Sequence, residues 1–266
     1  MTESRYVHGY TSRECDRLTN QANALSELLH HDTVFAPGTL VLECGCGTGA
    51  QTVFLASRNP GAQIVSIDIS ATSLEQARLR MGAAQSVEFL EANIFELPFD
   101  DEHFDHVFLC FILEHLAAPA TALSAARRVL RRDGTITVIE GDHGSWYCYP
   151  QTKESSRVVQ CLVDVQARLG GDGLIGRRLY PLLASAGFRE VQVSPRMVYV
   201  DGSRPDLVKG FSRDTFIAMV EGIHDRAISL GLIDQRTWDK GIADLYRATE
   251  PDGTFCYSFF KAKGTR

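Results

Sequence analysis

Between residues 38 and 142 the chain alternates short apolar segments with segments of helical periodicity. The apolar segments are rich in aliphatic and β-branched side chains, as expected of strands that are buried on both faces of a parallel sheet. Alternation of strand and helix predicts right-handed crossovers and an α/β fold with a doubly wound sheet. We expect five strands here, at 39–44, 63–68, 86–90, 104–110 and 135–140.

The helical segments between these strands have recognisable ends. Ser70 is suited to cap one helix, and Pro119 suits the first turn of another. We expect this second helix to bury Leu130 and to end at Gly134. Its last turn would carry the arginines between 127 and 132, where cations complement the helix dipole.

The rest of the chain departs from this alternation. Residues 1–36 contain one helical pattern with Leu18, Ala22, Leu25 and Leu29 on one face. Two further strands are expected at 188–200 and 254–262, separated by two helical patterns. The pattern therefore predicts one domain over residues 1–266, with a core at 38–142. Within this domain we expect an N-terminal lid helix in residues 1–36, and cap insertions at 143–173 and 202–252 that cover the top of the sheet.

Composition narrows the class of protein. Hydrophobic residues at 44% and charged residues at 23% of 266 are ordinary globular values, which exclude a disordered, collagen-like or coiled-coil chain. The net charge of −6 and the lack of a basic cluster argue against nucleic acid as a partner. No apolar run approaches the roughly 20 residues that a membrane span needs. Seven scattered cysteines favour reduced thiols and a cytoplasmic location.

The sharpest motif is residues 41–49, Val-Leu-Glu-Cys-Gly-Cys-Gly-Thr-Gly, where a strand ends and a helical pattern begins. Glycine is required where a backbone turns tightly and passes close to a ligand. Gly45, Gly47 and Ala50 match a loose dinucleotide fingerprint, and Asp68 stands 21 residues after Gly47, where a carboxylate can accept ribose hydroxyls. This motif alone leaves open a nicotinamide cofactor or another adenosine nucleoside.

Residues around the motif favour a cationic nucleoside. Glu43 would place a carboxylate where a dinucleotide has its pyrophosphate, whereas it would attract an ammonium or sulfonium group. After the third strand, the Asn93 amide can bond to the edge of adenine, and Ile94 can pack on the ring. After the fourth strand comes Cys-Phe-Ile-Leu-Glu-His-Leu at 110–116.

Together these motifs resemble the class I S-adenosylmethionine-dependent methyltransferases. The segments 43–49, 93–94, 113–116 and 134–136, together with Asp68, stand in the order and spacing of that family. The resemblance covers residues 38–142 and the last two strands. It implies a seven-stranded, mostly parallel sheet in the order 3-2-1-4-5-7-6, with the last strand antiparallel. It also implies S-adenosyl-L-methionine as the cofactor, S-adenosyl-L-homocysteine as the product, and no metal.

The resemblance assigns contacts with each part of the cofactor. A tyrosine ahead of the first helix, Tyr10 or Tyr6, would close over it. The other implied contacts are Gly45, Gly47 and nearby Glu43 with the methionine part, Asp68 with the ribose, Ile69 on adenine, Asn93 and Ile94 beside the base, and the backbone of Cys110 and Phe111 along the methionine side.

Methyl transfer is an in-line displacement that requires the nucleophile, methyl group and sulfur to be held collinear in a dry site. An oxygen or nitrogen acceptor needs a base in addition. The carboxyl ends of strands form the ligand crevice of open α/β sheets. Our candidates are therefore His115, Glu140 and His143 as catalytic residues, and Asp142, Trp146 and Tyr147 as substrate ligands.

The sequence favours a methyltransferase that acts on a small, largely apolar or aromatic metabolite. Carbon of an isoprenoid chain or an electron-rich ring is an attractive acceptor, because no dedicated base stands out. The alternatives are an O- or N-methyltransferase of a polar metabolite, a nicotinamide oxidoreductase or aminopropyl transferase, and a regulatory protein that binds the cofactor without turnover. Assembly into a homo-oligomer is left open.

Overall fold

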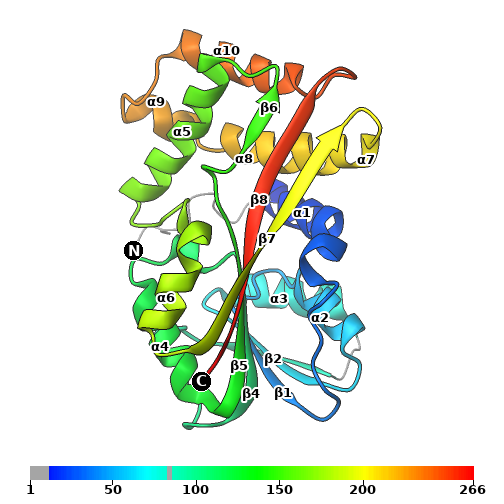
Figure 1. Ribbon diagram of the computed structural model, residues 1–266, viewed down its shortest axis with the longest axis vertical. Helices are drawn as coiled ribbons and strands as arrows, with labels where there is room; N and C mark the ends of the chain where they lie inside the picture. Colours follow the sequence, from blue (N-terminus) through cyan, green and yellow to red (C-terminus); the bar gives the residue numbers. More distant parts are fainter. Residues whose placement is uncertain (1–11, 83–85) are drawn as a thin grey trace. The chain divides into compact units, whose positions relative to one another are not determined.

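A computed structural model describes residues 12–82 and 86–266 (Figure 1). Its contacts divide the chain into two compact units. We call Leu29–Glu140, Ile175–Pro195 and Phe260–Arg266 the glycine-loop unit. The aromatic unit comprises the described part of Met1–Leu28, Gly141–Leu174 and Arg196–Phe259. Both predicted insertions fall within the aromatic unit, and their role as caps of a single domain stays a prediction.

Eight strands form one sheet in the order β3-β2-β1-β4-β5-β8-β6, and β7 also pairs with β8. The sixth and seventh predicted strands are β7 and β8, so the predicted order 3-2-1-4-5-7-6 is confirmed. The pairs among β1 to β5 are parallel. The strands are β1 Leu40–Cys44, β2 Gln63–Asp68, β3 Val87–Glu91, β4 Phe104–Cys110, β5 Leu130–Gly141, β6 Tyr147–Tyr149, β7 Arg189–Asp201 and β8 Thr254–Thr265.

The short strand β6 was not predicted. It pairs antiparallel with β8, with Tyr147 opposite Cys256 and Tyr149 opposite Thr254. Three residues are too few to show a period-two pattern, and β6 exists only because β8 offers it a partner.

Among the helices, Ser70 caps α3 as predicted, since its hydroxyl accepts a hydrogen bond from the Ser73 amide at 3.2 Å. On α1, Ala22, Leu25 and Leu29 are buried, as the periodicity predicts. The described helices are α1 Ser12–His30, α2 Thr52–Arg58, α3 Ala71–Met81, α4 Pro119–Val129, α5 Lys153–Arg168, α6 Leu179–Ser185, α7 Pro205–Leu207, α8 Ala218–Glu221, α9 His224–Ser229 and α10 Gln235–Arg247; η1 Leu113–His115 and η2 Ile175–Arg178 are 3-10 turns, and η3 Val208–Ile217 is a π-helix.

The predicted end of α4 at Gly134 is wrong. The helix ends at Val129, and Leu130 begins β5 opposite Phe104 of β4. The extra residues are taken up by a register shift between Phe104 and His106, and Asp133 turns with a φ of 62°. Pairing with β4 satisfies backbone groups and still buries Leu130, so the tertiary contact outweighs helix periodicity.

One apolar core holds the glycine-loop unit together. Its buried members include Leu42 of β1, Val107 and Leu109 of β4, Val138 of β5 and Leu183 of α6. Figure 1 shows α4 and α6 on one side of these strands and α2 and α3 on the other. This packing holds the carboxyl ends of β1, β2, β4 and β5 along one edge of the sheet.

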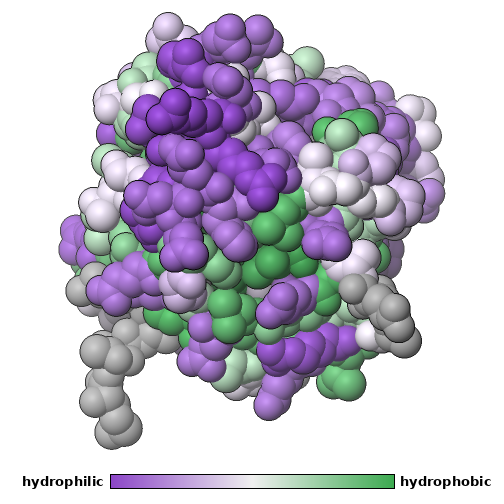
Figure 2. Space-filling view, turned by 90° about the horizontal axis from the view of Figure 1, so that it is seen from below, coloured by the Kyte–Doolittle hydropathy of each residue, from purple (hydrophilic) through white to green (hydrophobic). Residues whose placement is uncertain are grey.

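Some apolar side chains remain on the surface. Ile69 is 66% exposed and Val34 is 74% exposed. Figure 2 shows one face of the molecule, where a hydrophobic area lies among hydrophilic residues. None of the described helices has the length and apolar character to cross a membrane.

Candidate functional site

The glycine loop follows β1, and its three glycines all have positive φ, 71° at Gly45, 52° at Gly47 and 75° at Gly49. A Cβ atom on Gly45 would lie 2.1 Å from Cδ1 of Ile112, and one on Gly49 would lie 3.0 Å from Cβ of Ala77. Within residues 12–82 and 86–266, and apart from Gly47 and its two neighbours in the chain, no atom lies within 4 Å of the corresponding position on Gly47. Gly45 and Gly49 are thus required by packing, whereas Gly47 borders open space that a ligand can approach.

Asp68 ends β2 and faces this loop. One carboxylate oxygen accepts the Gly47 amide at 2.8 Å, and the other accepts the Ser70 amide at 2.9 Å. Burial raises the pKa of Asp68, and the amide hydrogen bonds oppose that shift. Each oxygen keeps a second lone pair for a hydroxyl donor. The adjacent Ile69 exposes an apolar side chain of the kind that can pack on a flat ring.

Glu43 lies under the loop and is almost fully buried. Its Oε2 atom accepts the hydroxyls of Thr52 at 2.7 Å and Ser66 at 2.6 Å. Burial raises the pKa of Glu43 to about 7, although both hydrogen bonds favour the ionised form. A ligand cation beside this carboxyl would favour the ionised form further.

This raised pKa predicts that Glu43 makes the protein less stable as pH rises. The folded state keeps a proton that the unfolded chain releases between about pH 4.5 and 7, so the free energy of unfolding falls across that window. We expect Glu43→Gln to remove this loss, roughly 3 kcal/mol at pH 8 relative to pH 4.5. Urea unfolding of both proteins at several pH values measures it. An equal difference at all pH values would contradict the assignment.

Asn93 and Ile94 follow β3. The Asn93 Oδ1 atom accepts the Phe95 amide at 3.0 Å, which orients the side chain within a turn. The Nδ2 group is therefore the part of this amide to offer to a ligand acceptor. Ile94 is half-buried and packs against the apolar core.

The turn after β4 brings Cys110 and Phe111 to the same sheet edge. Phe111 has a φ of 58°, and its amide donates to the Ile139 carbonyl at 2.9 Å. Glu140, at the end of β5, accepts the amides of Ile112 and Leu113 through Oε1 at 3.0 and 2.7 Å. Burial, and then the nearby Glu114, raise the pKa of Glu140 well above its ordinary value.

The remaining predicted residues are placed as follows. His115 lies in η1 with Nε2 3.6 Å from Glu114 Oε1, in the glycine-loop unit. Asp142, His143, Trp146 and Tyr147 belong to the aromatic unit. Asp142 is buried and accepts the Gly144 amide at 2.9 Å, whereas Tyr147 is 50% exposed on β6. Tyr10 and Tyr6 lie outside the described residues.

Within the aromatic unit, His143 has a partner that was not predicted from the sequence, Tyr257. The Tyr257 hydroxyl lies 2.8 Å from His143 Nδ1, and both side chains are buried. A Cβ atom on Gly141 would lie 2.5 Å from this hydroxyl, so glycine leaves the space for it. Alternating aromatic residues at 255, 257 and 259 are the one sequence signal for this buried side of β8.

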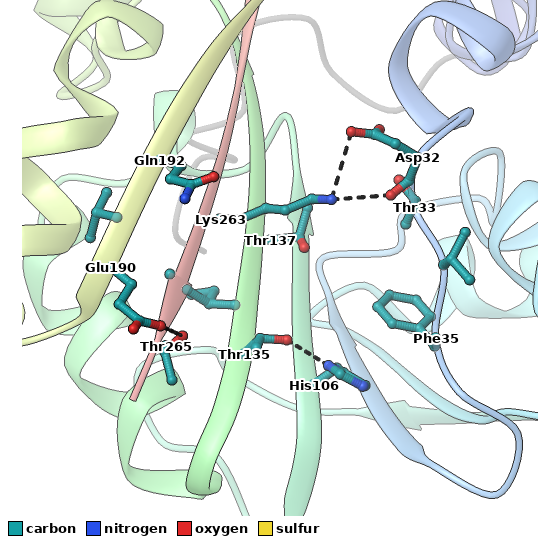
Figure 3. A pocket seen from close by; sticks show the side chains of 14 residues that line it. Asp32, Thr33, Phe35, His106, Thr135, Thr137, Glu190, Gln192, Lys263 and Thr265 are labelled. Atoms are coloured by element: carbon teal, nitrogen blue, oxygen red, sulfur yellow. Dashed lines mark hydrogen bonds and ion pairs between the residues drawn. The ribbon is translucent and has the colours of Figure 1, made fainter.

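A cavity of about 650 Å³ lies in the glycine-loop unit, but no predicted site residue lines it. His106 of β4 bonds there to the Thr135 hydroxyl at 2.6 Å, and Lys263 of β8 reaches the Asp32 carbonyl at 3.1 Å (Figure 3). His106 is level with Val41 at the start of β1. This cavity is therefore at the opposite end of the strands from the glycine loop. Among the described residues, no group of three or more His, Cys, Asp or Glu is arranged to hold a metal ion.

Comparisons with known proteins agree with this geometry. Residues 42–138 match a family model described as a methyltransferase domain. An uncharacterized 37.1 kDa protein in transposon TN4556 of Streptomyces fradiae is 34% identical over 200 residues, which are 74% of this chain and 54% of that protein. Demethylmenaquinone methyltransferase of Clavibacter sepedonicus is 37% identical over 103 residues, 39% of this chain and 41% of the relative. The chain spans about half the length of the curated relatives it matches.

Among solved structures, phosphoethanolamine N-methyltransferase 2 of Haemonchus contortus, in complex with S-adenosyl-L-methionine, superposes with a TM-score of 0.56. The likeness covers 93% of this chain and 52% of that one, at 16% identity, and it shows the fold. The glycine loop, Asp68 and Asn93 all lie inside the matched residues 42–138. Residues 42–138 of this chain are therefore identified as a methyltransferase domain, with the fold of the S-adenosylmethionine-dependent methyltransferases.

Proposed function

We propose that this protein transfers the methyl group of S-adenosyl-L-methionine to a small, largely apolar or aromatic acceptor. The observation that carries the proposal is the arrangement after β1 and β2. Open space beside Gly47 adjoins the loop amide that donates to the Asp68 carboxylate, and the buried Glu43 lies near the end of β1, just before the first glycine of that loop. An adenosyl sulfonium matches this combination, because its ribose needs acceptors and its amino-acid end carries positive charge.

In this proposal Asp68 accepts the ribose hydroxyls, Ile69 packs on adenine, and the Asn93 Nδ2 group donates to the base. Gly45, Gly47 and the backbone of Cys110 and Phe111 line the amino-acid part of the cofactor. Each contact uses a donor, acceptor or apolar surface that fits the group it would meet. Ile69, for instance, is an exposed apolar side chain beside a ribose acceptor.

Glu43 should make cofactor binding depend on pH. Below its pKa of about 7 the carboxyl is protonated, and binding of a cation must first displace that proton. We expect the affinity for S-adenosyl-L-methionine to fall by up to about tenfold per pH unit below 7. Calorimetry from pH 5.5 to 8.5 measures this, with Glu43→Gln expected to show a flat profile. An identical slope in both proteins would remove Glu43 from the site.

The apolar acceptor is supported by the name of the Clavibacter relative, demethylmenaquinone methyltransferase. It is also supported by the aromatic unit, in which the rings of Trp146, Phe216 and Phe255 pack together with centroids 4.7 to 6.4 Å apart. Aromatic side chains of this kind suit apolar ligands. In the proposal, Asp142, Trp146 and Tyr147 contact the acceptor, and His115 and His143 serve the reaction.

A second candidate is an O- or N-methyltransferase of a polar metabolite. The buried hydrogen bond between His143 and Tyr257 favours it, because an acceptor that carries an O–H or N–H needs a group to take its proton. A cytoplasmic location also belongs to the proposal. It is supported by the six described cysteines, all of which are free and buried.

The test begins with calorimetry of the purified chain against S-adenosyl-L-homocysteine and against NAD and NADP. Uptake of the first alone is expected, and uptake of a nicotinamide cofactor alone would overturn the proposal. The chain is then incubated with methyl-labelled cofactor and cell-extract fractions. Label in an organic-soluble compound supports the apolar acceptor, and label in a polar metabolite supports the second candidate. Binding with no transfer to any fraction would favour a regulatory protein.

A further inference from the structure

Glu140 is fully buried at the end of β5, and one of its carboxylate oxygens accepts hydrogen bonds from backbone amides. Oε1 accepts the Ile112 amide at 3.0 Å and the Leu113 amide at 2.7 Å. Two consecutive amides at the start of η1 thus donate to one side-chain oxygen of β5. The carboxyl group takes the place of a helix cap, since those amides have no partner within the helix.

The turn at residues 111–113 has a strained backbone, and hydrogen bonds from β5 stabilise it. Phe111 adopts a left-handed conformation with a φ of 58°, which is unfavourable for a bulky residue. The Ile139 carbonyl holds the Phe111 amide from one side at 2.9 Å. Glu140 holds the next two amides, so β5 anchors the turn at three consecutive residues.

The same turn positions a side chain against the glycine loop. Cδ1 of Ile112 occupies the space that a Cβ atom on Gly45 would need, at a separation of 2.1 Å. Ile112 is therefore in direct contact with the first glycine of the loop. Any shift of the Ile112 amide would move this contact, which connects the Glu140 carboxyl to the glycine loop.

The surroundings of Glu140 suit a neutral acid. Its Oε2 atom is buried and has no hydrogen-bond partner among the described residues. Glu114 is close and also nearly buried, so two negative charges here would repel each other at low dielectric. A protonated carboxyl can still accept through Oε1, because its carbonyl oxygen keeps both lone pairs. An amide could then replace it.

We propose that Glu140 is a positioning residue of the cofactor site. Its carboxyl group holds the turn at 111–113 so that Ile112 closes against Gly45 and shapes the part of the site that receives the amino-acid end of the cofactor. The inference rests on the proposed function, in which Gly45 approaches that end. It assigns Glu140 a role different from the acid-base role that the sequence suggested.

Two ligands separate this role from a general loss of structure. S-adenosyl-L-homocysteine carries the amino-acid end, and 5′-methylthioadenosine has the same adenosine without it. We expect Glu140→Leu to weaken binding of the first by about tenfold or more, as loss of one or two hydrogen bonds implies. Binding of the second should change by less than about threefold. Glu140→Gln should bind both ligands, and turn over, within about threefold of the unaltered protein.

A second variant covers the case in which Glu140→Leu does not fold. Ile112→Ala keeps its backbone amide, and we expect it to show the same selective loss. Equal losses for both ligands, or none, in these variants would overturn the inference while leaving the proposed function intact. A Glu140→Gln protein that binds both ligands but has lost turnover would restore the acid-base role. If the unaltered protein binds neither ligand, the proposed function fails, and this inference with it.

Discussion

Replacing Asp68 with alanine is expected to lower the affinity for S-adenosyl-L-homocysteine by about 100-fold or more. In the proposed complex this carboxylate accepts two ribose hydroxyls, and each hydrogen bond to a charged group contributes roughly 1.5 to 3 kcal/mol. The same carboxylate holds the Gly47 amide at 2.8 Å, so its loss also frees the glycine loop. Calorimetry measures the effect, and urea unfolding shows whether the variant still folds.

Two comparisons sharpen this result. Asp100→Ala removes an exposed carboxylate from the same unit and should leave the affinity unchanged. Asp68→Asn keeps one acceptor oxygen and should fall between Asp68→Ala and the unaltered protein. If Asp68→Ala folds and binds the ligand normally, the ribose lies elsewhere and the proposed orientation of the cofactor is wrong.

The second large effect is expected at Lys261 of β8, which is 1% exposed. Its ammonium group donates to the Leu29 carbonyl at 3.0 Å, Asp32 Oδ1 at 2.6 Å and the Thr33 hydroxyl at 2.6 Å. Lys261→Met keeps the aliphatic stem but leaves these acceptors, at the end of α1, without the charge. Removing one partner of a buried ion pair lowers the free energy of unfolding by about 3 to 5 kcal/mol. Because Asp32 is partly exposed, we expect a loss of about 3 kcal/mol for Lys261→Met.

The chain offers a matched control two residues away. Lys263 is on the same strand, and its ammonium group also contacts Asp32, at 3.6 Å, but it is half exposed. Lys263→Met should therefore lower the free energy of unfolding by less than about 1 kcal/mol. Urea unfolding of the two variants measures both changes. Similar losses in the free energy of unfolding would contradict the prediction that the buried Lys261 stabilises the protein more than the exposed Lys263 does.

The sequence predicted the strands well because their signals are local. The strand at 63–68 contains the β-branched residues Ile64, Val65 and Ile67, and its structural limits coincide with the prediction. Ser70 was identified as a cap because a hydroxyl before a helical pattern can bond to an amide three residues later. Where a competing partner lay far along the chain, prediction failed. Leu130 was assigned to a helix because its pairing with Phe104 is not visible in local periodicity.

For the site, residue type and spacing identified Gly47 and Asp68, which the structure brings within hydrogen-bond distance. The same reasoning marked Glu140 for its position after a strand. It could not show that its carboxyl bonds to amides 27 and 28 residues earlier in the chain. The hydrogen bonds that Glu43 accepts from Thr52 and Ser66 were likewise not predicted. The two hydroxyls come from separate elements, and no sequence motif connects them to Glu43.

By itself, the sequence determined the alternation of strands and helices, the glycine loop and the acidic residue that faces it. Each depends on neighbouring residues, whose backbone preferences and hydrophobic periods act over a few positions. Only the tertiary structure decided which buried groups meet, as when Lys261 caps a helix that ends more than 200 residues earlier. Such contacts form because a buried charge or amide must find a partner wherever packing brings one within reach.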